Sequence, residues 1–294
     1  MAWLQLSVLT GRSKADTFSD ALESLGAVSV TLQDAADEAL LEPSPGEHPV
    51  WQSVNITAIF PSDAEPARLR NAVRDALGDP DSGIAIERLE DQDWSETWRR
   101  DFHAMQFGTR LWVCPTHELP SDPDAVVVDM DPGLAFGTGT HATTAMCLEW
   151  LDAHAPAGLQ VIDYGCGSGI LAIAACKLGA GGVTGVDIDP QAILSTRENA
   201  KRNGVQDTLH AVLPGDPDIR DADLVLANIL ANPLIELATT LNALARPGGR
   251  IVMTGILGEQ AEDVMAAYRE WFVFDEPVRR EGWVLLVGHK RGDV

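Results

Sequence analysis

The most constraining feature of this chain is an apolar strand that ends in an acid and runs directly into a glycine loop. Residues 161–170 read Val-Ile-Asp-Tyr-Gly-Cys-Gly-Ser-Gly-Ile. Glycine lets a backbone approach a ligand where a β-carbon would collide with it. A dinucleotide fingerprint would place its third glycine at position 170, which is Ile170 here. The segment predicts a strand, loop and helix, in which the loop either binds a ligand or only makes a tight turn.

From about residue 125 onward, strand patterns alternate with helix patterns. This alternation is typical of a mostly parallel sheet covered on both faces. The expected strands cover 126–130, 159–164, 183–187, 209–213, 223–228, 249–254, 272–276 and 283–289. The expected helices cover 141–154, 169–178, 190–203, 232–245 and 258–270. The last two strands are too close in sequence for a crossover helix, so we expect them to pair antiparallel.

The N-terminal part of the chain has a different pattern. Its expected elements are strands at 2–9, 27–33, 51–60 and 83–89 and helices at 14–26 and 65–77. The resulting order, β-α-β-β-α-β, predicts an α+β ferredoxin-like domain over residues 1–90.

A short connection is expected to join this domain to the rest of the chain. Residues 91–104 predict a linker helix that places Trp94, Trp98 and Phe102 on one face. Packing against a neighbouring domain explains these aromatic residues better than contact with a ligand. The second domain is expected over residues 105–294, beginning with a hairpin at 105–114 that turns near Gly108.

Composition excludes several classes of protein. The 294 residues carry a net charge of −23, and the acidity is spread out: residues 1–90 hold 15 acids and 6 bases, and the remainder holds 29 and 15. Such a surface repels phosphate backbones, which argues against nucleic acid as the main partner. No apolar run reaches the roughly 20 residues that a membrane span needs. With no secretion signal and no Cys-x-x-Cys pair among four cysteines, we expect a cytoplasmic protein without zinc or disulfides.

An acid follows the next expected strand, 22 residues beyond Gly165. Asp187 ends that strand, where a carboxylate can accept hydrogen bonds from both hydroxyls of a ribose. Asp189 is expected to cap the following helix, with Pro190 at its first position.

Two further segments bring hydroxyl and amide groups toward the same edge of the expected sheet. Residues 131–144 are rich in glycine and threonine and lead into a helix, so they can close over a ligand carboxylate or simply cap the helix. His141, at the helix start, is better explained by a local hydrogen bond than by catalysis. Asn228 ends an apolar strand, and its amide can accept a hydrogen bond from an amine, although it can also be an idle strand-end residue. Asn232 is expected to cap the next helix.

Together these segments resemble the methyltransferases of large-subunit ribosomal protein eleven. The resemblance is carried by residues 131–144, 161–170, 186–190 and 228–231, with Trp94, Trp98 and 111–115 in support. It covers nearly the whole chain, and its most specific part is Leu-Ala-Phe-Gly-Thr-Gly-Thr-His at 134–141. Position 142 is Ala where the family usually has Pro. The fourth motif is Asn-Ile-Leu-Ala rather than Asn-Pro-Pro-Tyr, which disfavours a nucleobase or glutamine amide as the methyl acceptor.

The resemblance implies a class I methyltransferase with a Rossmann-like, seven-stranded sheet and S-adenosylmethionine as the methyl donor. It implies that Thr144, Gly165, Gly167, Asp187 and Asn228 contact this cofactor, and that Asn228 also serves catalysis by positioning the acceptor amine. The implied substrate is the basic ribosomal protein, modified on lysine ε-amines and the N-terminal α-amine and captured by the ferredoxin-like domain. No metal site is implied, and we expect a monomer.

Three alternatives stay open on the residues alone. A nicotinamide-dependent oxidoreductase can use a similar glycine loop, but Ile170 and the lack of an obvious acid–base pair for hydride transfer oppose it. A non-catalytic ribosome-assembly protein would not need the cofactor motifs. An RNA methyltransferase is the main competitor within the same class, and the dispersed negative charge weighs against it.

Overall fold

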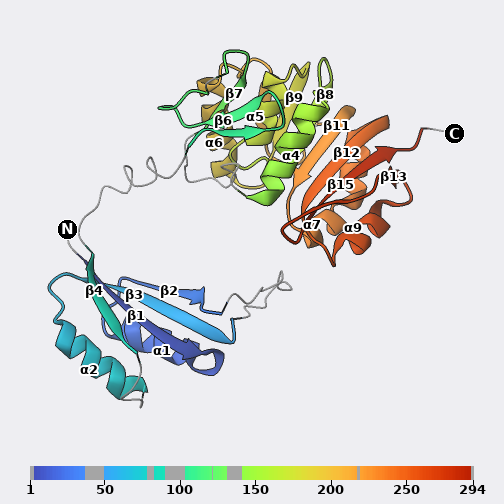
Figure 1. Cartoon of the computed structure of the whole chain (residues 1–294). Helices are drawn as coiled ribbons and strands as arrows, with labels where there is room; N and C mark the ends of the chain where they lie inside the picture. Colours follow the sequence, from blue (N-terminus) through green and yellow to red (C-terminus); the bar gives the residue numbers. More distant parts are fainter. Residues whose placement is uncertain are drawn as a thin grey trace. The chain divides into compact units, whose positions relative to one another are not determined.

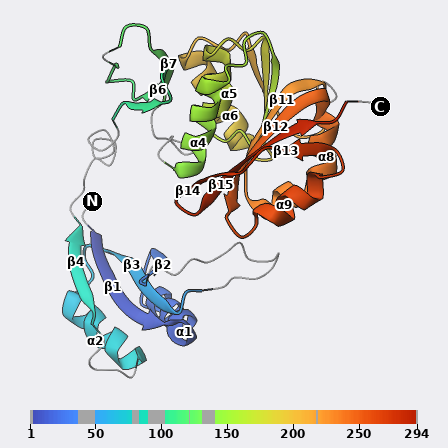
Figure 2. The same ribbon diagram turned by 45° about the vertical axis from the view of Figure 1, so that its right-hand side comes forward.

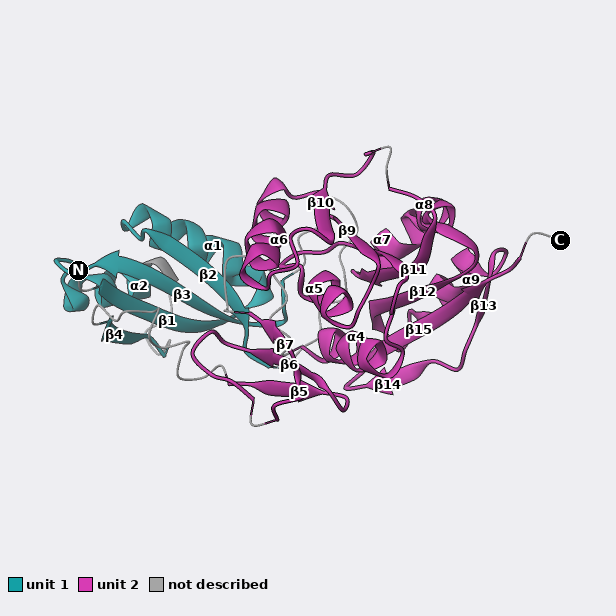
Figure 3. Ribbon diagram, turned by 90° about the horizontal axis from the view of Figure 1, so that it is seen from above, with its two compact units in different colours: residues 1–97 teal, residues 98–294 magenta. Residues whose placement is uncertain are grey.

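The computed structural model describes residues 3–36, 50–77, 83–89, 103–120, 122–130, 141–216 and 219–292. The chain divides into two compact units, Met1–Thr97 and Trp98–Val294 (Figure 3). The expected linker helix at 91–104 lies almost wholly outside the described residues, so its aromatic face stays a prediction. No helix within the described ranges is long and apolar enough to cross a membrane.

The N-terminal unit has the β-α-β-β-α-β order predicted from its sequence. The four strands form one antiparallel sheet in the order β2-β3-β1-β4. The elements are β1 (Trp3–Gly11), α1 (Arg12–Ser24), β2 (Ser29–Asp34), β3 (Ser53–Pro61), α2 (Pro66–Leu77) and β4 (Ala85–Leu89). Alternate residues of β1 and β3 are buried and pack with α1 and α2 into one apolar cluster. This arrangement confirms the ferredoxin-like prediction.

The second unit begins with a small three-stranded sheet. Strands β5 (Met105–Phe107) and β6 (Leu111–Cys114) form the expected antiparallel hairpin, and Gly108 stands in its turn with φ +74°. Strand β7 (Val126–Asp129) pairs parallel with β6. The sequence pattern predicted that residues 126–130 belong to the large sheet whose strands alternate with helices. Instead, β7 belongs to the small sheet, because it pairs with β6 of the hairpin.

The large sheet follows the path β10-β9-β8-β11-β12-β15-β13 (Figure 1). Its strands are β8 (Gln160–Tyr164), β9 (Gly182–Val186), β10 (Leu209–Val212), β11 (Ala222–Asn228), β12 (Ala245–Leu257), β13 (Phe272–Phe274) and β15 (Trp283–Lys290). The first five on this path are parallel. Strand β15 pairs antiparallel with β13, as predicted for the last two strands, and also antiparallel with β12, which was not predicted. The seven strands of the path confirm the Rossmann-like prediction. A further short strand, β14 (Val278–Arg280), pairs with β15 and was not predicted.

Helices cover both faces of this sheet (Figure 2). One face carries α4 (Ala142–Ala153), α5 (Ile170–Lys177) and α6 (Pro190–Arg202), and the other carries α7 (Ala231–Glu236), α8 (Ala238–Leu244) and α9 (Ala261–Tyr268). Strand residues alternate between the two apolar clusters, with Val161 in one and Ile162 in the other. On the second face, Tyr268 of α9 is fully buried and donates a 2.7 Å hydrogen bond to the carbonyl oxygen of Leu234 in α7.

Two predictions about the segment after β11 were wrong. The single helix expected at 232–245 is two helices, because Leu237, with φ −85° and ψ 3°, ends α7 and precedes α8. Asn232 is not the cap, since α7 begins at Ala231 and its capping position is Leu230, which makes no side-chain capping bond. Neither glycine nor proline marks the break, so a sequence pattern had no signal for it.

Candidate functional site at the carboxyl edge of the sheet

The glycine loop between β8 and α5 has the backbone that its sequence predicted. Gly165, Gly167 and Gly169 all have positive φ, at 80°, 54° and 81°. The amides of Gly165 and Cys166 donate to the carbonyl oxygen of Val186, the last residue of β9, at 2.7 and 3.1 Å. Gly165 and Gly167 are partly exposed, whereas Gly169 is buried. The loop therefore presents two glycine backbones to solvent at the carboxyl ends of β8 and β9.

Two side chains of α6 donate hydrogen bonds to backbone carbonyl groups of this loop. The Thr196 hydroxyl donates to the carbonyl oxygen of Gly167 at 3.0 Å, and the Asn199 amide donates to that of Ser168 at 2.9 Å. A β-carbon on Gly169 would lie 2.9 Å from the Thr196 methyl group. Gly169 is thus required for helix packing, and only the two exposed glycines are free to face a ligand.

Asp187 follows β9, and its carboxylate is fixed by two backbone amides. The amide of Gly167 donates to Oδ2 at 2.9 Å, and the amide of Asp189 donates to Oδ1 at 3.0 Å. Each oxygen keeps a further lone pair for another donor. Asp189 caps α6 through the amide of Gln191, with Pro190 at the helix start, as the sequence predicted.

Asn228 and Thr144, which are 84 residues apart in the chain, meet at the same edge. Asn228 is the last residue of β11 and is half-buried, and Thr144 lies in the first turn of α4 and is buried. The side-chain amide of Asn228 donates to the Thr144 hydroxyl at 3.2 Å. The residue after Asn228 also touches the glycine loop, because a β-carbon on Gly165 would overlap the Cγ2 methyl of Ile229. All five residues predicted for the site are therefore linked through direct neighbours.

His141 has the local role that the sequence favoured. It is the N-cap of α4, where its Nδ1 accepts from the amide of Thr143 at 3.3 Å and lies 2.7 Å from the Thr143 hydroxyl. Its ring packs edge-on against Trp283 of β15, with centroids 5.0 Å apart. The preceding residues 131–140, which carry the most specific part of the motif, lie outside the described residues.

The sequence analysis included Asp163 in the strand-and-glycine pattern but assigned no role to this acid, which is buried on β8 directly before the glycine loop. Its side chain is 1% exposed, its Oδ2 accepts from the amide of Ala172 at 3.0 Å, and its Oδ1 is buried without a hydrogen-bond partner among the described residues. Burial raises the pKa of Asp163 to about 7, an effect that the Ala172 bond opposes and the charge of Asp187 reinforces. The signal in the sequence was a single acid in an otherwise apolar strand. Carboxyl groups whose pKa is strongly shifted by burial are frequent at functional sites.

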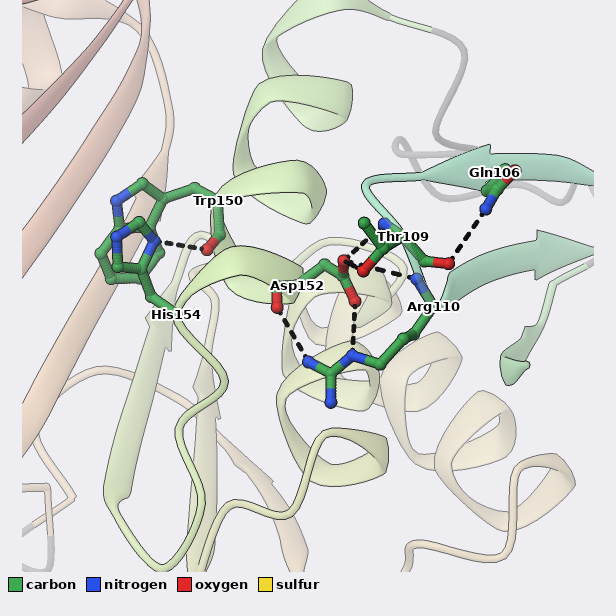
Figure 4. Close-up of polar contacts among 6 residues, drawn as sticks. All are labelled: Gln106, Thr109, Arg110, Trp150, Asp152 and His154. Atoms are coloured by element: carbon green, nitrogen blue, oxygen red, sulfur yellow. Dashed lines mark hydrogen bonds and ion pairs between the residues drawn. The ribbon is translucent and has the colours of Figure 1, made fainter. Parts of the chain in front are cut away.

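A second buried acid anchors α4 at its far end (Figure 4). Asp152, with a side chain 2% exposed, accepts from the amide and hydroxyl of Thr109 at 2.6 and 3.0 Å and forms a 3.3 Å ion pair with Arg110. The Arg110 guanidinium also donates to the carbonyl oxygen of Asp152 at 2.8 Å. A β-carbon on Gly108 would lie 2.9 Å from that of Asp152, so the hairpin turn fits the helix only with glycine there. The helix that carries Thr144 is thus tied to the β5–β6 hairpin.

The cysteines take no visible part in this site. All four are free, and burial raises the pKa of the Cys166 thiol to about 12, which keeps it neutral at physiological pH. Among the residues that the structure describes, no three His, Cys, Asp or Glu side chains gather in a metal-binding arrangement. The chemistry of the edge therefore comes from amide, hydroxyl, carboxylate and backbone groups.

Comparison with known proteins finds relatives that match nearly the whole sequence. Residues 2–291 match the model of the family described as ribosomal protein L11 methyltransferase (PrmA). The ribosomal protein L11 methyltransferases of Marinobacter nauticus and Methylococcus capsulatus are each 52% identical to this chain, covering 99% and 98% of it and 99% of each relative. The crystal structure of the ribosomal protein L11 methylase from Lactobacillus delbrueckii subsp. bulgaricus matches with a TM-score of 0.60 at 33% identity, over 65% of this chain and all of that one. The chain belongs to the ribosomal protein L11 methyltransferase family.

Proposed function

We propose that this protein transfers methyl groups from S-adenosylmethionine to lysine ε-amines and the N-terminal α-amine of ribosomal protein L11. The observation that carries the proposal is the gathering of Gly165, Gly167, Asp187, Asn228 and Thr144 at one sheet edge. Open α/β sheets bind their ligands at this edge. The family to which the chain belongs supplies the identity of the donor and of the acceptor protein.

The residues present fit S-adenosylmethionine. The backbones of Gly165 and Gly167 are partly exposed, so they can lie directly against the methionine part. Asp187 is held with one lone pair on each oxygen available, which suits the two hydroxyls of a ribose. Ile188, the next residue, is 81% exposed and offers an apolar surface beside that carboxylate for a flat base. We therefore assign the cofactor to Thr144, Gly165, Gly167, Asp187 and Asn228.

S-adenosylmethionine supplies a methyl group that is already activated by its bond to a positively charged sulfur. What the chain must provide is alignment of the acceptor and exclusion of water, both of which accelerate a displacement without acid catalysis. Asn228 is placed to do the first, because its amide oxygen can accept a hydrogen bond from the acceptor amine while its NH₂ group is held by Thr144.

The acceptor amine must be neutral before it can attack. A free lysine has a pKa of about 10.4, so it is charged at neutral pH. Asn228 cannot take the proton, since an amide is not a base at this pH. Leu230, two residues beyond Asn228, is 48% exposed, and the apolar surface that it offers lowers the pKa of an amine that packs against it. We assign the neutral state of the amine to this desolvation, with the proton released to water, rather than to a side-chain base.

The N-terminal unit is proposed to capture the substrate protein. It has its own core and lies outside the sheet that carries the cofactor edge. The net charge of −23 favours encounter with a basic ribosomal protein and disfavours RNA as the acceptor. We further propose a monomer that acts in the cytoplasm.

Intact-mass analysis of purified L11 tests the proposal. After incubation with the full-length protein and S-adenosylmethionine, L11 should gain whole methyl increments that peptide mapping places on lysines and the N-terminus. Parallel reactions with ribosomal RNA should yield no methyl transfer. Unmodified L11, or a thermal shift with NAD that exceeds the shift with S-adenosylmethionine, would overturn the proposed function.

A further inference from the structure

The chain that leaves Asn228 passes directly over a glycine of the neighbouring strand. Asn228 is the last residue of β11, and its register partner in β12 is Thr254. Strand β12 continues past this point to Leu257, and its pairing with β15 shifts register between Met253 and Ile256. Ile229 therefore leaves the sheet above Gly255, at an irregularity of β12.

Gly255 cannot carry a side chain in this position for two separate reasons. Its φ is +87°, a conformation that residues with a β-carbon rarely adopt. A β-carbon there would also overlap the carbonyl oxygen of Ile229 and lie 2.7 Å from its carbonyl carbon and 3.3 Å from its amide nitrogen. All three atoms belong to the backbone, so the collision can be relieved only if the backbone at 229, at 255 or at both moves.

Ile229 is also in contact with the glycine loop that follows β8, the strand on the other side of β11. A β-carbon on Gly165 would overlap the Cγ2 methyl of Ile229, so the isoleucine side chain occupies the space that this glycine leaves open. On the β12 side, Thr254 is fully buried and its hydroxyl donates to the carbonyl oxygen of Val284 at 3.0 Å, which ties the irregular segment to β15. Ile229 thus sits between two glycines, with its side chain toward Gly165 and its backbone toward Gly255.

We propose that Gly255 is a positioning residue for methyl transfer, which acts through Ile229 to set the place of the Asn228 amide. This inference rests on the proposed function, because it assumes that Asn228 aligns the acceptor amine. The neighbouring 3.2 Å hydrogen bond from Asn228 to Thr144 has little tolerance for movement of the turn, since a bond of this kind weakens quickly with distance and angle.

Gly248 provides a matched control for backbone strain. It lies within β12 as well, has φ +73°, and would place a β-carbon in open space with nothing within 4 Å. Gly255→Ala and Gly248→Ala therefore introduce similar strain, but only the first pushes on the backbone of Ile229. A difference between the two variants reports on the contact and not on the unusual φ.

The first experiment measures single-turnover methylation of L11 at saturating cofactor and substrate, together with cofactor affinity by calorimetry. We expect Gly255→Ala to lower the rate constant by on the order of tenfold to a hundredfold, because small misplacements of aligning groups cost that much. The cofactor Kd should rise as well, because Asn228 and Thr144 also belong to the proposed cofactor site, and saturating cofactor removes this effect from the measured rate constant. Gly248→Ala should transfer methyl groups at the wild-type rate.

The second experiment asks whether Gly255 acts through Asn228. In a double-mutant cycle, Gly255→Ala should cost nothing further in the Asn228→Ala background, because the group that it displaces is already gone. A readout that needs no catalysis is the side-chain amide NMR signal of Asn228, identified by its loss in Asn228→Ala. Without cofactor, this signal should shift in Gly255→Ala and stay in place in Gly248→Ala.

Several outcomes would overturn the inference. Equal rates for the Gly255 and Gly248 variants, an unmoved Asn228 signal, or effects that multiply in the double variant would each do so. If Gly255→Ala does not fold, Ile229→Ala loosens the turn from the Gly165 side and should lower the rate, whereas Ile229→Val, which keeps Cγ2, should not; equal activity of these two variants would also end the proposal. Wild-type protein that leaves L11 unmodified would instead refute the proposed function.

Discussion

At the scale of single residues, the local geometry of the candidate site could be predicted from the sequence, whereas the ligand contacts of its residues stay predictions. A carboxylate after a strand and a glycine loop before a helix single out Asp187 and Gly165 by their spacing. Contacts between distant segments could not be predicted in the same way. The rule that the strands of an open sheet bind ligands at their carboxyl ends does not say that the Asn228 side chain contacts Thr144 of α4. The pattern included Asp163, but its unpaired Oδ1 could not be predicted, because that depends on burial in the folded protein.

Replacing Asp187 with alanine should weaken cofactor binding and leave the fold intact. The substitution removes the acceptor proposed for the ribose, and a lost hydrogen bond to a charged group costs about 1.5 to 3 kcal/mol, or roughly tenfold to a hundredfold in Kd. Calorimetry with S-adenosylmethionine measures the change, and far-ultraviolet circular dichroism checks the fold. Asp189→Ala, which removes only a helix cap, is the control and should keep wild-type affinity. An unchanged Kd in the Asp187 variant would refute the ribose assignment.

Asp163 predicts a pH dependence of stability. Its pKa is raised by burial to about 7 in the folded protein, against about 3.9 for an unfolded aspartate. The folded state therefore binds more protons between these values, so this group lowers stability as pH rises from about 4 to about 7 and then contributes a constant penalty. Asp163→Asn, which stays neutral, should raise the melting temperature at pH 8 more than at pH 5. An equal change at both pH values would show that the carboxyl is not held protonated.

At the scale of helices and strands, hydrophobic periodicity predicted nearly every element of both units. The failures have different physical origins. Leu237 interrupts a helical pattern without glycine or proline, and β7 pairs with β6 rather than joining the large sheet, and neither outcome has a local signal. Strand β14 pairs with β15 across the two-residue turn Glu281-Gly282, in which both residues have positive φ, so this hairpin had a local signal that was overlooked.

The anchor between α4 and the β5–β6 hairpin should be a large local source of stability. Asp152→Ala leaves the amide of Thr109 and the guanidinium of Arg110 without their acceptor, and we expect a loss of about 2 to 4 kcal/mol in the free energy of unfolding. Thr109→Val removes only the hydroxyl bond and should cost about 1 kcal/mol. Chemical denaturation of both variants measures these losses. Equal, small losses would show that the contact is not an anchor.

The acid limb of unfolding gives a second check on this anchor. Burial alone would raise the pKa of Asp152, but hydrogen bonds from Thr109 and Arg110 and the charge of Arg110 lower it overall. Its contribution is therefore complete above the unfolded pKa of about 3.9 and is lost as pH falls through the lower folded value. The stability difference between wild type and Asp152→Ala should shrink below about pH 4 and stay constant above it.

At the scale of the whole molecule, the proposed function assigns binding of the substrate protein to one unit and binding of the cofactor to the other. Their apolar clusters share no residues, and the described site residues all belong to the second unit. Deleting residues 1–90 should therefore leave a folded catalytic unit whose cofactor Kd matches that of the full chain. The same truncation should lose methylation of intact L11, because it lacks the unit that is proposed to capture the folded substrate. A short, flexible lysine peptide does not offer the folded surface for such capture.

Comparing these two acceptors makes the deletion decisive. A lysine peptide at millimolar concentration needs only the edge formed by Asn228 and Thr144, so the truncated and full-length proteins should methylate it at similar, slow rates. Intact L11 at micromolar concentration should be modified by the full chain alone, since effective concentration falls sharply without a second binding module. If the truncated protein methylates intact L11 at the wild-type rate, recognition must lie on the catalytic unit, and the acidic surface of residues 105–294 becomes the surface to map.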